Sequence, residues 1–339
     1  MIICYNHSME NNYDLVAIGE TTIDAFIRLK DASVHCDINK ENCQICLAFG
    51  AKIPYESVEE IPAVGNAANA SVSAARLSLK SALVANIGKD RNGDLCVDAL
   101  KKDGVSTEFL TVNIDKPTNY HYILWFEDER TILQKHSDFP YKLPALGNPK
   151  WIYLTSLGEK SLEYHAEIAT FLKNNPEVKM AFQPGIFQIK IGFEKLKEIY
   201  KKTDIFFCNI EEAKTILDIK NHDEVKDLLK KMHKLGPKIV VLTDGPVGSY
   251  AYNGNEYWFM PPYPDPKPPY ERTGAGDAFS STIVAAIAIG KTLPEALAWG
   301  SVNAMSVVQE VGAQKGLLSR EKIEEYLKIA PEDYKAKKI

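Results

Sequence analysis

Cysteine is scarce in this chain of 339 residues, and its six cysteines do not have the regular spacing of a small disulfide-stabilised fold. A disulfide scaffold is therefore excluded. Long apolar runs are missing as well, since the most apolar segment, residues 283–289, is far too short to cross a bilayer. The middle of the chain has no block of lysine and arginine, and the net charge of −5 argues against nucleic acid or a membrane surface as partner. The first residues show no basic start followed by an apolar stretch, so we expect no signal peptide and a cytoplasmic protein.

The chain does have the composition of a well-packed globular protein, with 45% apolar and 25% charged residues. Short apolar runs alternate with helical patterns over most of its length. The predicted strands are residues 15–18, 82–87, 151–154, 180–182, 205–207 and 239–242, and the predicted helices are residues 67–79, 95–103, 161–173 and 224–235. This alternation is typical of a doubly wound, mostly parallel α/β sheet with helices on both faces. We expect one such domain over residues 14–330.

Two segments break this alternation. Residues 119–126 and 130–135 are aromatic and β-branched, and the polar residues 127–129 between them predict an antiparallel hairpin. The segment 25–62 also lacks helical periodicity. We expect a small β-sheet lid, made of about residues 25–62 and 113–137, over the ends of the parallel strands. The aromatic residues of this lid, namely Tyr120, Tyr122 and Trp125, predict a homodimer formed through it.

A short motif near the C-terminus has the residues that phosphoryl transfer requires. Gly274, Ala275 and Gly276 are small enough for successive backbone N–H groups to face one anion at the start of a helix. Asp277 follows directly, where its carboxylate can accept the proton of an attacking hydroxyl. The alternative interpretation is an ordinary helix N-terminus, with glycine for the turn and aspartate as a cap.

Three stretches resemble the PfkB/ribokinase family of carbohydrate kinases. Residues 273–279 (TGAGDAF) match most of the family's C-terminal signature, and residues 64–70 (VGNAANA) are similar to its N-terminal signature before an alanine-rich helix. Residues 87–93 (IGKDRNG) are similar to the strand end that follows that helix. The resemblance extends from residue 14 to about residue 320 and implies a ribokinase-like fold that uses ATP and Mg²⁺.

The resemblance also implies roles for individual residues. Asp277 is implied to be the general base, with Gly274, Ala275 and Gly276 as the anion hole. The residues implied to contact the substrate are Asp24, Gly65, Asn66 and Asn69. The residues implied to border ATP are Asn209, Glu212, Thr243, Gly245, Gly248 and Gly312, with Glu212 holding Mg²⁺ through water.

Simpler structural explanations exist for several of these residues. Asp24 could end a strand, and Asn66 and Asn69 could cap a helix. Glu212 could be an exposed helical residue, and the glycines of the segment 245–248 could only form a hairpin turn. We prefer the functional interpretation because all of these residues then belong to a single site.

The sequence departs from the family pattern at two places. Val64 replaces the first glycine of the N-terminal pair, which alters the expected shape of the substrate pocket. Glu271 and Arg272 replace the aspartate and threonine before the C-terminal signature. In many relatives that aspartate helps to bind potassium, so the resemblance makes Glu271 a candidate ligand of a monovalent cation. Arg272 either contacts a phosphate or pairs with a carboxylate at the surface.

Three cysteines and a histidine lie close together in the predicted lid. Cys43 and Cys46 have C-x-x-C spacing, and His35 and Cys36 precede them, so four ligands for a tetrahedral zinc site are present. Thiols that simply pack within a β-sheet are the alternative.

The sequence therefore predicts a kinase that transfers a phosphoryl group from ATP to a hydroxyl of a small sugar. A nucleoside kinase is an alternative from the same family, because an aromatic lid could stack on a base. A sugar-binding protein without catalytic activity is the alternative from another class. The presence of Asp277 and of both glycines of the anion turn argues against it.

Overall fold

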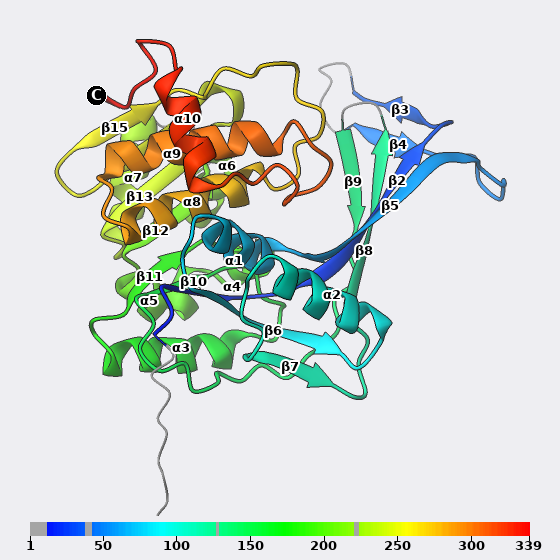
Figure 1. The fold of residues 1–339 in the computed structure, drawn as a ribbon, viewed down its shortest axis with the longest axis horizontal. Helices are drawn as coiled ribbons and strands as arrows, with labels where there is room; N and C mark the ends of the chain where they lie inside the picture. The colour runs from blue at the N-terminus through cyan, green and yellow to red at the C-terminus, as the bar shows by residue number, and fades with distance from the viewer. Residues whose placement is uncertain (1–11, 38–42, 127–128, 220–223) are drawn as a thin grey trace, which may run out of the picture.

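Ten strands form the largest sheet of the computed structural model, which describes residues 12–37, 43–126, 129–219 and 224–339 (Figure 1). The strands are β1 (Leu15–Ile18), β6 (Ser81–Gly88), β7 (Leu110–Asn113), β10 (Trp151–Leu154), β11 (Lys179–Phe182), β12 (Ile205–Asn209), β13 (Ile239–Thr243), β14 (Ser249–Tyr252), β15 (Tyr257–Met260) and β16 (Lys337–Lys338). Their order is β16-β15-β14-β13-β12-β11-β10-β1-β6-β7. Neighbours from β13 to β7 pair in parallel, and β14, β15 and β16 add an antiparallel edge.

Helices cover both faces of this sheet. They are α1 (Asn66–Arg76), α2 (Arg91–Lys102), α3 (Leu162–Asn174), α4 (Ile186–Ile191), α5 (Phe193–Lys202), α6 (Ile210–Ile216), α7 (Val225–Lys234), α8 (Ala275–Ala288), α9 (Leu293–Val307) and α10 (Arg320–Lys328). Successive residues of each strand point to opposite faces, so Leu15 and Leu83 pack with α1, α2, α8, α9 and α10. Val16 and Val84 pack instead with α3, α5, α6 and α7.

The doubly wound α/β fold predicted from the sequence is confirmed. Each predicted parallel strand and each predicted helix forms at or near its expected position, because short apolar strands and amphipathic helices are encoded locally. The strands β7, β14, β15 and β16 of this sheet are not among the predicted strands.

A second sheet stands beside the first and has four strands in the order β5-β2-β8-β9 (Figure 1). These are β2 (Thr22–Leu29), β5 (Tyr55–Val64), β8 (Asn119–Phe126) and β9 (Glu129–Leu133), and we call them the lid sheet. The predicted hairpin is present as β8 and β9, although its turn residues 127–128 lie outside the described residues. β2 pairs with β5 antiparallel and with β8 in parallel. The lid sheet begins at Thr22 rather than at residue 25, and Asn113 ends β7 of the larger sheet.

The inner face of the lid sheet packs against the loop that follows α9. Phe26, Ile123 and Trp125 form a small separate core with Val311 of that loop, and Ile61 packs against it. Gly312, the next residue of the loop, passes so close that a Cβ atom there would lie 2.4 Å from Cδ1 of Ile61. The lid sheet is therefore in direct contact with the body of the protein.

A short hairpin of β3 (Ser33–His35) and β4 (Gln44–Cys46) belongs to the segment expected to bind zinc. Cys36 and Cys43 form a disulfide there, and the ring of His35 lies 3.3 Å from the hydroxyl of Ser33. Among the described residues no group of three or more His, Cys, Asp or Glu side chains is arranged to hold a metal ion, so the zinc hypothesis is not supported. Residues 38–42 of the predicted lid lie outside the described residues.

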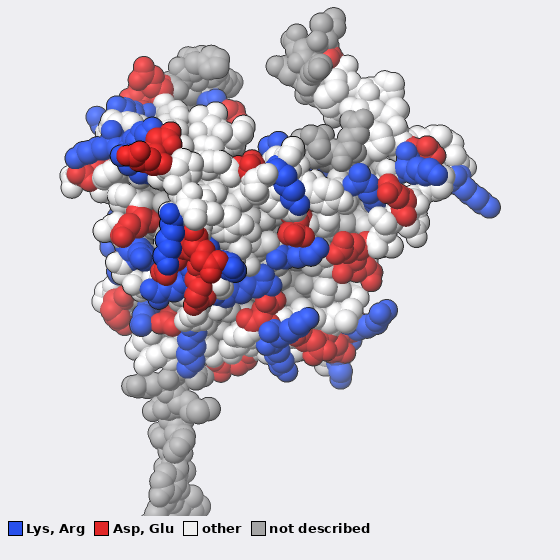
Figure 2. Space-filling view, turned by 45° about the horizontal axis from the view of Figure 1, so that its top comes forward, with Lys and Arg blue, Asp and Glu red and all other residues white. Residues whose placement is uncertain are grey.

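The helices and one face of the surface bear on whether the protein spans a membrane or binds nucleic acid. In the part of the chain that the structure describes, no helix combines the length and apolarity needed to cross a bilayer. On the face drawn in Figure 2, lysine and arginine are intermixed with aspartate and glutamate. This face therefore lacks the extended positive area that typically binds nucleic acid.

Candidate active site

The motif of residues 274–277 forms the start of α8, as both interpretations of the sequence require. Gly274 is the N-cap, with a left-handed φ of 80° that favours glycine. A Cβ atom at Gly274 would lie 2.3 Å from Cβ of Ala313, so the turn is packed tightly on that side. At Gly276, in contrast, an added Cβ would meet no atom within 4 Å. The first N–H groups of α8 have no preceding helical carbonyl, and the turn that carries them is open at Gly276.

Three side-chain amides hold the carboxylate of Asp277. Asn66 Nδ2 donates to Oδ1 over 3.0 Å, Gln183 Nε2 donates to the same oxygen over 3.2 Å, and Asn69 Nδ2 donates to Oδ2 over 2.8 Å. Asp277 is only 8% exposed. Burial raises the pKa of Asp277, and the three amides counteract part of that rise. A carboxylate that is fixed in orientation and has a raised pKa is suited to accept a proton.

The junction between β5 and α1 brings the two asparagines to Asp277. Gly65 stands there with φ of 102°, and a Cβ atom on it would lie 3.1 Å from the carbonyl oxygen of Glu20. The expected substrate residues Gly65, Asn66 and Asn69 thus lie together, beside the start of the lid sheet. Asn66 is the first residue of α1 and not its cap, so its amide is directed to Asp277 instead.

Two glutamines complete this arrangement, and the sequence analysis predicted neither of their contacts. Gln314 Nε2 donates to Oδ1 of Asn69 over 3.0 Å, which leaves the amide nitrogen of Asn69 to face Asp277. Gln183 follows β11 directly. The carboxyl ends of parallel strands are where such sheets bind ligands, and this position is the signal that could have revealed Gln183.

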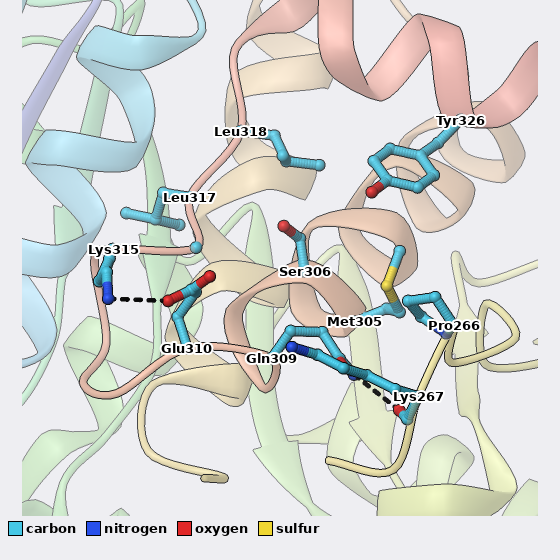
Figure 3. Close-up of a pocket in the computed structure, with 11 residues that line it drawn as sticks. Pro266, Lys267, Met305, Ser306, Gln309, Glu310, Lys315, Leu317, Leu318 and Tyr326 are labelled. Atoms are coloured by element: carbon cyan, nitrogen blue, oxygen red, sulfur yellow. Dashed lines mark hydrogen bonds and ion pairs between the residues drawn. The ribbon is translucent and has the colours of Figure 1, made fainter. Parts of the chain in front are cut away.

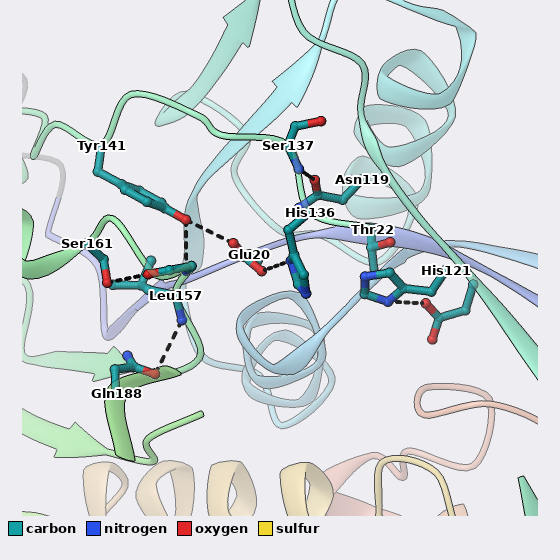
Figure 4. Close-up of polar contacts among 12 residues, drawn as sticks. Glu20, Thr22, Asn119, His121, His136, Ser137, Tyr141, Leu157, Ser161 and Gln188 are labelled. Carbon is teal, nitrogen blue, oxygen red and sulfur yellow. Dashed lines mark hydrogen bonds and ion pairs between the residues drawn. The ribbon is translucent and has the colours of Figure 1, made fainter. Parts of the chain in front are cut away.

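A second polar cluster lies where the chain passes from β1 into the lid sheet (Figure 4). The carboxylate of Asp24 lies 3.3 Å from Nδ1 of His121, and that of Glu20 lies 2.7 Å from Nδ1 of His136. The two imidazole rings contact each other edge to face, with centroids 5.2 Å apart. Tyr141 donates a hydrogen bond of 2.9 Å to Glu20. Asp24 therefore lies within a strand and is paired with a histidine, rather than ending the strand.

The sequence analysis missed both histidines and Glu20. The signal for His121 is the alternation along β8, where Asn119, His121, Ile123 and Trp125 are buried and the residues between them are more exposed. No comparable pattern marks His136, which follows β9 in a segment without regular structure.

This cluster offers hydrogen-bonding atoms that the protein itself does not use. Nε2 of His121 and Nδ2 of Asn119 are buried and have no hydrogen-bond partner within the described part of the chain. The hydrogen bond to Glu20 raises the pKa of His136, and burial opposes that rise. Buried amide and imidazole groups beside two carboxylates are suited to hydroxyl groups, which both donate and accept.

Five of the six residues expected to border ATP lie at or just after the carboxyl ends of β12 and β13, whereas Gly312 belongs to the loop after α9. Asn209 and Glu212 cap α6 reciprocally, because Asn209 Oδ1 accepts from the Glu212 N–H over 2.8 Å and Glu212 Oε2 accepts from the Asn209 N–H over 2.9 Å. Thr243 ends β13, and a 3-10 turn over Gly245–Val247 leads into β14. Gly248 closes this hairpin turn, where a Cβ atom would lie 2.4 Å from a backbone oxygen of β15. The simpler explanation holds for Gly245 and Gly248, which form a hairpin turn, and it leaves room for a second role. It does not hold for Glu212, which caps α6 and is half-buried rather than exposed.

Glu212 lies near enough to Asp277 for their charges to interact. Burial raises the pKa of Glu212, the hydrogen bond from the Asn209 N–H lowers it, and the charge of Asp277 raises it further. Two carboxylates that repel each other beside an anion-binding turn fit a hydrated Mg²⁺, which prefers oxygen ligands and retains several of its waters.

A separate pocket of about 310 Å³ lies at the C-terminal end of α9, next to α10 (Figure 3). Met305, Leu318 and Tyr326 line it, together with Glu310 and Lys315, which form an ion pair of 2.9 Å. None of the residues predicted to bind sugar, ATP or a cation borders this pocket, so it is not part of the candidate active site.

The sequence model of the pfkB family carbohydrate kinases matches residues 15–320 of this chain. The chain belongs to the PfkB family. This confirms the resemblance carried by residues 64–70 and 273–279. The chain is accordingly an enzyme of a family that phosphorylates carbohydrates and related compounds.

Curated relatives include kinases with different substrates. Ribokinase of Bacillus subtilis is 24% identical over 277 residues, which are 80% of this chain and 89% of that protein. A nucleoside kinase of Methanothermobacter thermautotrophicus is 22% identical over 316 residues, 91% of this chain and 94% of that protein. The bifunctional ribokinase/ribose-5-phosphate isomerase A of Fructilactobacillus sanfranciscensis is 22% identical over 324 residues, and these are 91% of this chain but 55% of that longer protein.

Solved structures show the same fold. Arabidopsis thaliana ribokinase, complexed with ribose and ATP, has a TM-score of 0.78 at 20% identity, with 94% of this chain and 99% of that one covered. A putative ribokinase II from E. coli, in complex with ATP and Mg²⁺, has a TM-score of 0.74 at 18% identity, with 93% of this chain and 99% of that one covered. At these identities the likeness establishes the ribokinase-like fold.

In this PfkB-family chain the monovalent cation expected at Glu271 does not fit. The residue is 2% exposed, and its carboxylate accepts hydrogen bonds from the N–H and hydroxyl of Thr273 and, over 3.3 Å, from the N–H of Gly312. A guanidinium nitrogen of Arg130 lies 3.5 Å from the same carboxylate. N–H donors and an arginine repel a cation, so this environment is not that of a metal ligand. Arg272 is exposed, as the surface interpretation expected.

Proposed function

We propose that the protein transfers the terminal phosphoryl group of ATP to a hydroxyl of a small sugar, with Asp277 as general base. The observation that carries this proposal is the position of Asp277. It is a buried carboxylate held by three amides, in the first turn of a helix whose backbone is open at Gly276. An anion-binding turn and a base in the same turn are what an attack on a phosphoryl group needs.

In the proposed mechanism, the substrate hydroxyl donates a hydrogen bond to Asp277 and gives up its proton as its oxygen attacks the phosphorus. Asn66, Asn69 and Gln183 keep the carboxylate aimed at that hydroxyl. The unpaired N–H groups at the start of α8, in the turn of Gly274, Ala275 and Gly276, stabilise the charge on the phosphoryl oxygens.

We propose that the nucleotide lies along the carboxyl ends of β12 and β13. The residues proposed to border it are Asn209, Glu212, Thr243, Gly245, Gly248 and Gly312. Glu212 would hold Mg²⁺ through water, and the ion would neutralise charge on the phosphates. The support for this proposal is the closeness of Glu212 to Asp277 and the resemblance to kinases solved with ATP.

The substrate would lie between the lid sheet and α1. Asp24, Gly65, Asn66 and Asn69 would contact it, and the unused atoms of His121 and Asn119 would bind further hydroxyl groups. Such a lining favours a polyhydroxylated sugar, because each unpaired buried polar atom needs a partner.

A nucleoside is the second candidate. The ring of Phe187 contacts that of His136 edge to face, with centroids 5.9 Å apart, and this aromatic corner could receive a base. A panel of free sugars and nucleosides, assayed for ADP release, decides between the two classes. A protein that binds a sugar but releases no ADP would be the non-catalytic alternative.

Asp277→Asn tests the role of the base. The substitution keeps the size of the side chain, so the fold should persist, while kcat should fall by about 10²–10⁴. That loss corresponds to about 3–5 kcal/mol in the barrier. Asp204→Asn is the matched control, because Asp204 is also a largely buried carboxylate but directly precedes β12, at the amino ends of the parallel strands. The base assignment fails if Asp277→Asn keeps more than about a tenth of the turnover.

We also propose that residues 14–330 act as one kinase unit, in the cytoplasm where ATP is available, and that two copies associate through the lid sheet. Of the three aromatic residues from which the dimer was predicted, Trp125 is 5% exposed and faces inward, because side chains alternate along β8. The outer face of the lid sheet exposes 51% of Val58, 48% of Tyr122 and 51% of Leu133. Apolar side chains gathered on one sheet face favour association. Light scattering tests the dimer, and a monomer at micromolar concentration would remove it.

A further inference from the structure

Glu271 is a buried carboxylate just before the anion-binding turn of residues 274–277, which we call the catalytic turn. Its hydrogen-bond donors are the backbone and side chain of Thr273, which precedes Gly274, and the backbone of Gly312. Glu271 therefore ties the loop after α9 to the anion-binding turn. These donors are neutral, and a buried carboxylate is costly unless an opposite charge is nearby.

The opposite charge comes from the lid sheet. Arg130 lies in β9 directly opposite Trp125 of β8, on the inner face, and its guanidinium lies 3.5 Å from the Glu271 carboxylate. The side chains of Arg130 and Glu271 are 25% and 3% exposed, so water screens this pair weakly. The ring of Trp125 contacts Tyr270, the residue before Glu271, at a centroid distance of 5.2 Å. Two adjacent contacts thus join the lid sheet to the segment that leads into the catalytic turn.

We propose that Arg130 is the built-in counter-cation of Glu271, in the place where the family resemblance implied a monovalent metal ion. Arg130 is a positioning residue in this scheme. It supplies the charge opposite the buried Glu271 carboxylate, and Glu271 holds Thr273 and Gly312 in place. Because Arg130 belongs to the lid sheet and Glu271 to the body, the charge is neutralised only while the lid sheet rests on the body. The catalytic turn is thereby completed by the same element that covers the substrate.

A double-mutant cycle in the full-length protein tests the pairing without reference to activity. Arg130→Gln leaves the buried charge of Glu271 unpaired and should lower Tm, and the added substitution Glu271→Gln should recover part of that loss. Arg28→Gln is the matched control. Arg28 also lies on the inner face, 4.2 Å from the centre of the Trp125 ring, but it pairs with the exposed Glu56. Additive effects of the two substitutions would overturn the proposal.

The same variants test whether the arginine replaces a metal ion. Tm is measured in potassium chloride and in tetramethylammonium chloride at equal ionic strength. The wild type and Arg28→Gln should give equal values in the two salts, whereas potassium should raise Tm of Arg130→Gln by about 2 °C or more. Arg130→Lys, which keeps the charge, should behave as the wild type. A wild type stabilised by potassium, or an Arg130→Gln variant indifferent to it, contradicts the idea.

Kinase activity gives a second readout that rests on the proposed function. With any substrate that the panel identifies, kcat of Arg130→Gln should fall by about tenfold or more in tetramethylammonium chloride and recover in part with potassium. The wild-type rate should be the same in both salts. If no substrate is turned over, the proposed function fails, and the Tm measurements still decide the role of Arg130.

Discussion

Alanine substitutions at Gly276 and Gly274 should distinguish the catalytic role of the turn from its role in folding, because the first should lower activity and the second should lower stability. An added Cβ at Gly276 meets no atom within 4 Å, and the residue is helical, so Gly276→Ala should leave the free energy of unfolding unchanged or raise it by about 0.5–1 kcal/mol. The new methyl group would stand in the open space that the proposed function assigns to the phosphoryl group. A displacement of about 1 Å costs roughly 10²-fold in rate, so kcat/KM for ATP should fall by about that factor.

Gly274→Ala should instead damage the fold. Its φ of 80° suits glycine, and the added Cβ would lie 2.3 Å from that of Ala313. The left-handed conformation alone costs about 1–2 kcal/mol for an alanine, and the clash adds to it. Urea unfolding followed by tryptophan fluorescence measures stability, and ADP release measures turnover. If Gly276→Ala folds and turns over as the wild type does, residues 274–277 are only a helix start with an acidic cap, and the proposed mechanism is wrong.

Three further predictions concern the surroundings of this turn. Asn69→Ala removes a donor that lowers the pKa of Asp277, so the acid limb of the pH profile of kcat should move to higher pH, and an unmoved limb would contradict the proposed base. His136→Gln should destabilise the protein by about 1–3 kcal/mol at about pH 5.5 and by less at about pH 9, because Glu20 raises the pKa of His136 and this stabilisation is lost as pH rises through that raised value. Urea unfolding at the two pH values measures it, and an equal loss at both would exclude the ion pair as the cause. Cys43→Ser should leave turnover and bound zinc unchanged by kinetic assay and metal analysis, and a lost equivalent of zinc would restore the metal hypothesis.

The parts of the site that lie within a short stretch of sequence could be predicted. The turn of residues 274–277 and the start of α1 are local structures, and glycine, asparagine and aspartate at fixed spacing identify them. Their meeting, with Asn69 donating to Asp277 across 208 positions of sequence, followed only from the family resemblance.

The contacts made by the lid sheet could not be predicted in this way. The hairpin of β8 and β9 is visible as a pattern, but its parallel pairing with β2 depends on tertiary structure. That pairing places His121 beside Asp24, and the hairpin register places Arg130 opposite Trp125. A one-residue change of register would turn either side chain to the outer face, and no local pattern fixes the register between distant strands. Gln183 and His136 likewise lie outside any motif.

The chain passes several times between the lid sheet and the rest of the protein, and two of these crossings are short and carry the proposed substrate contacts. β1 ends at Ile18 and β2 begins at Thr22, with Glu20 between them, and β5 runs into α1 through Gly65. If the lid sheet opened by a hinge at these two crossings, the motion would also move the residues proposed to contact the substrate. The rate at which the sugar leaves would then be set by the rate at which the lid sheet opens. A substitution that only loosens the lid sheet, far from any sugar atom, should shorten the residence time of the sugar on the enzyme.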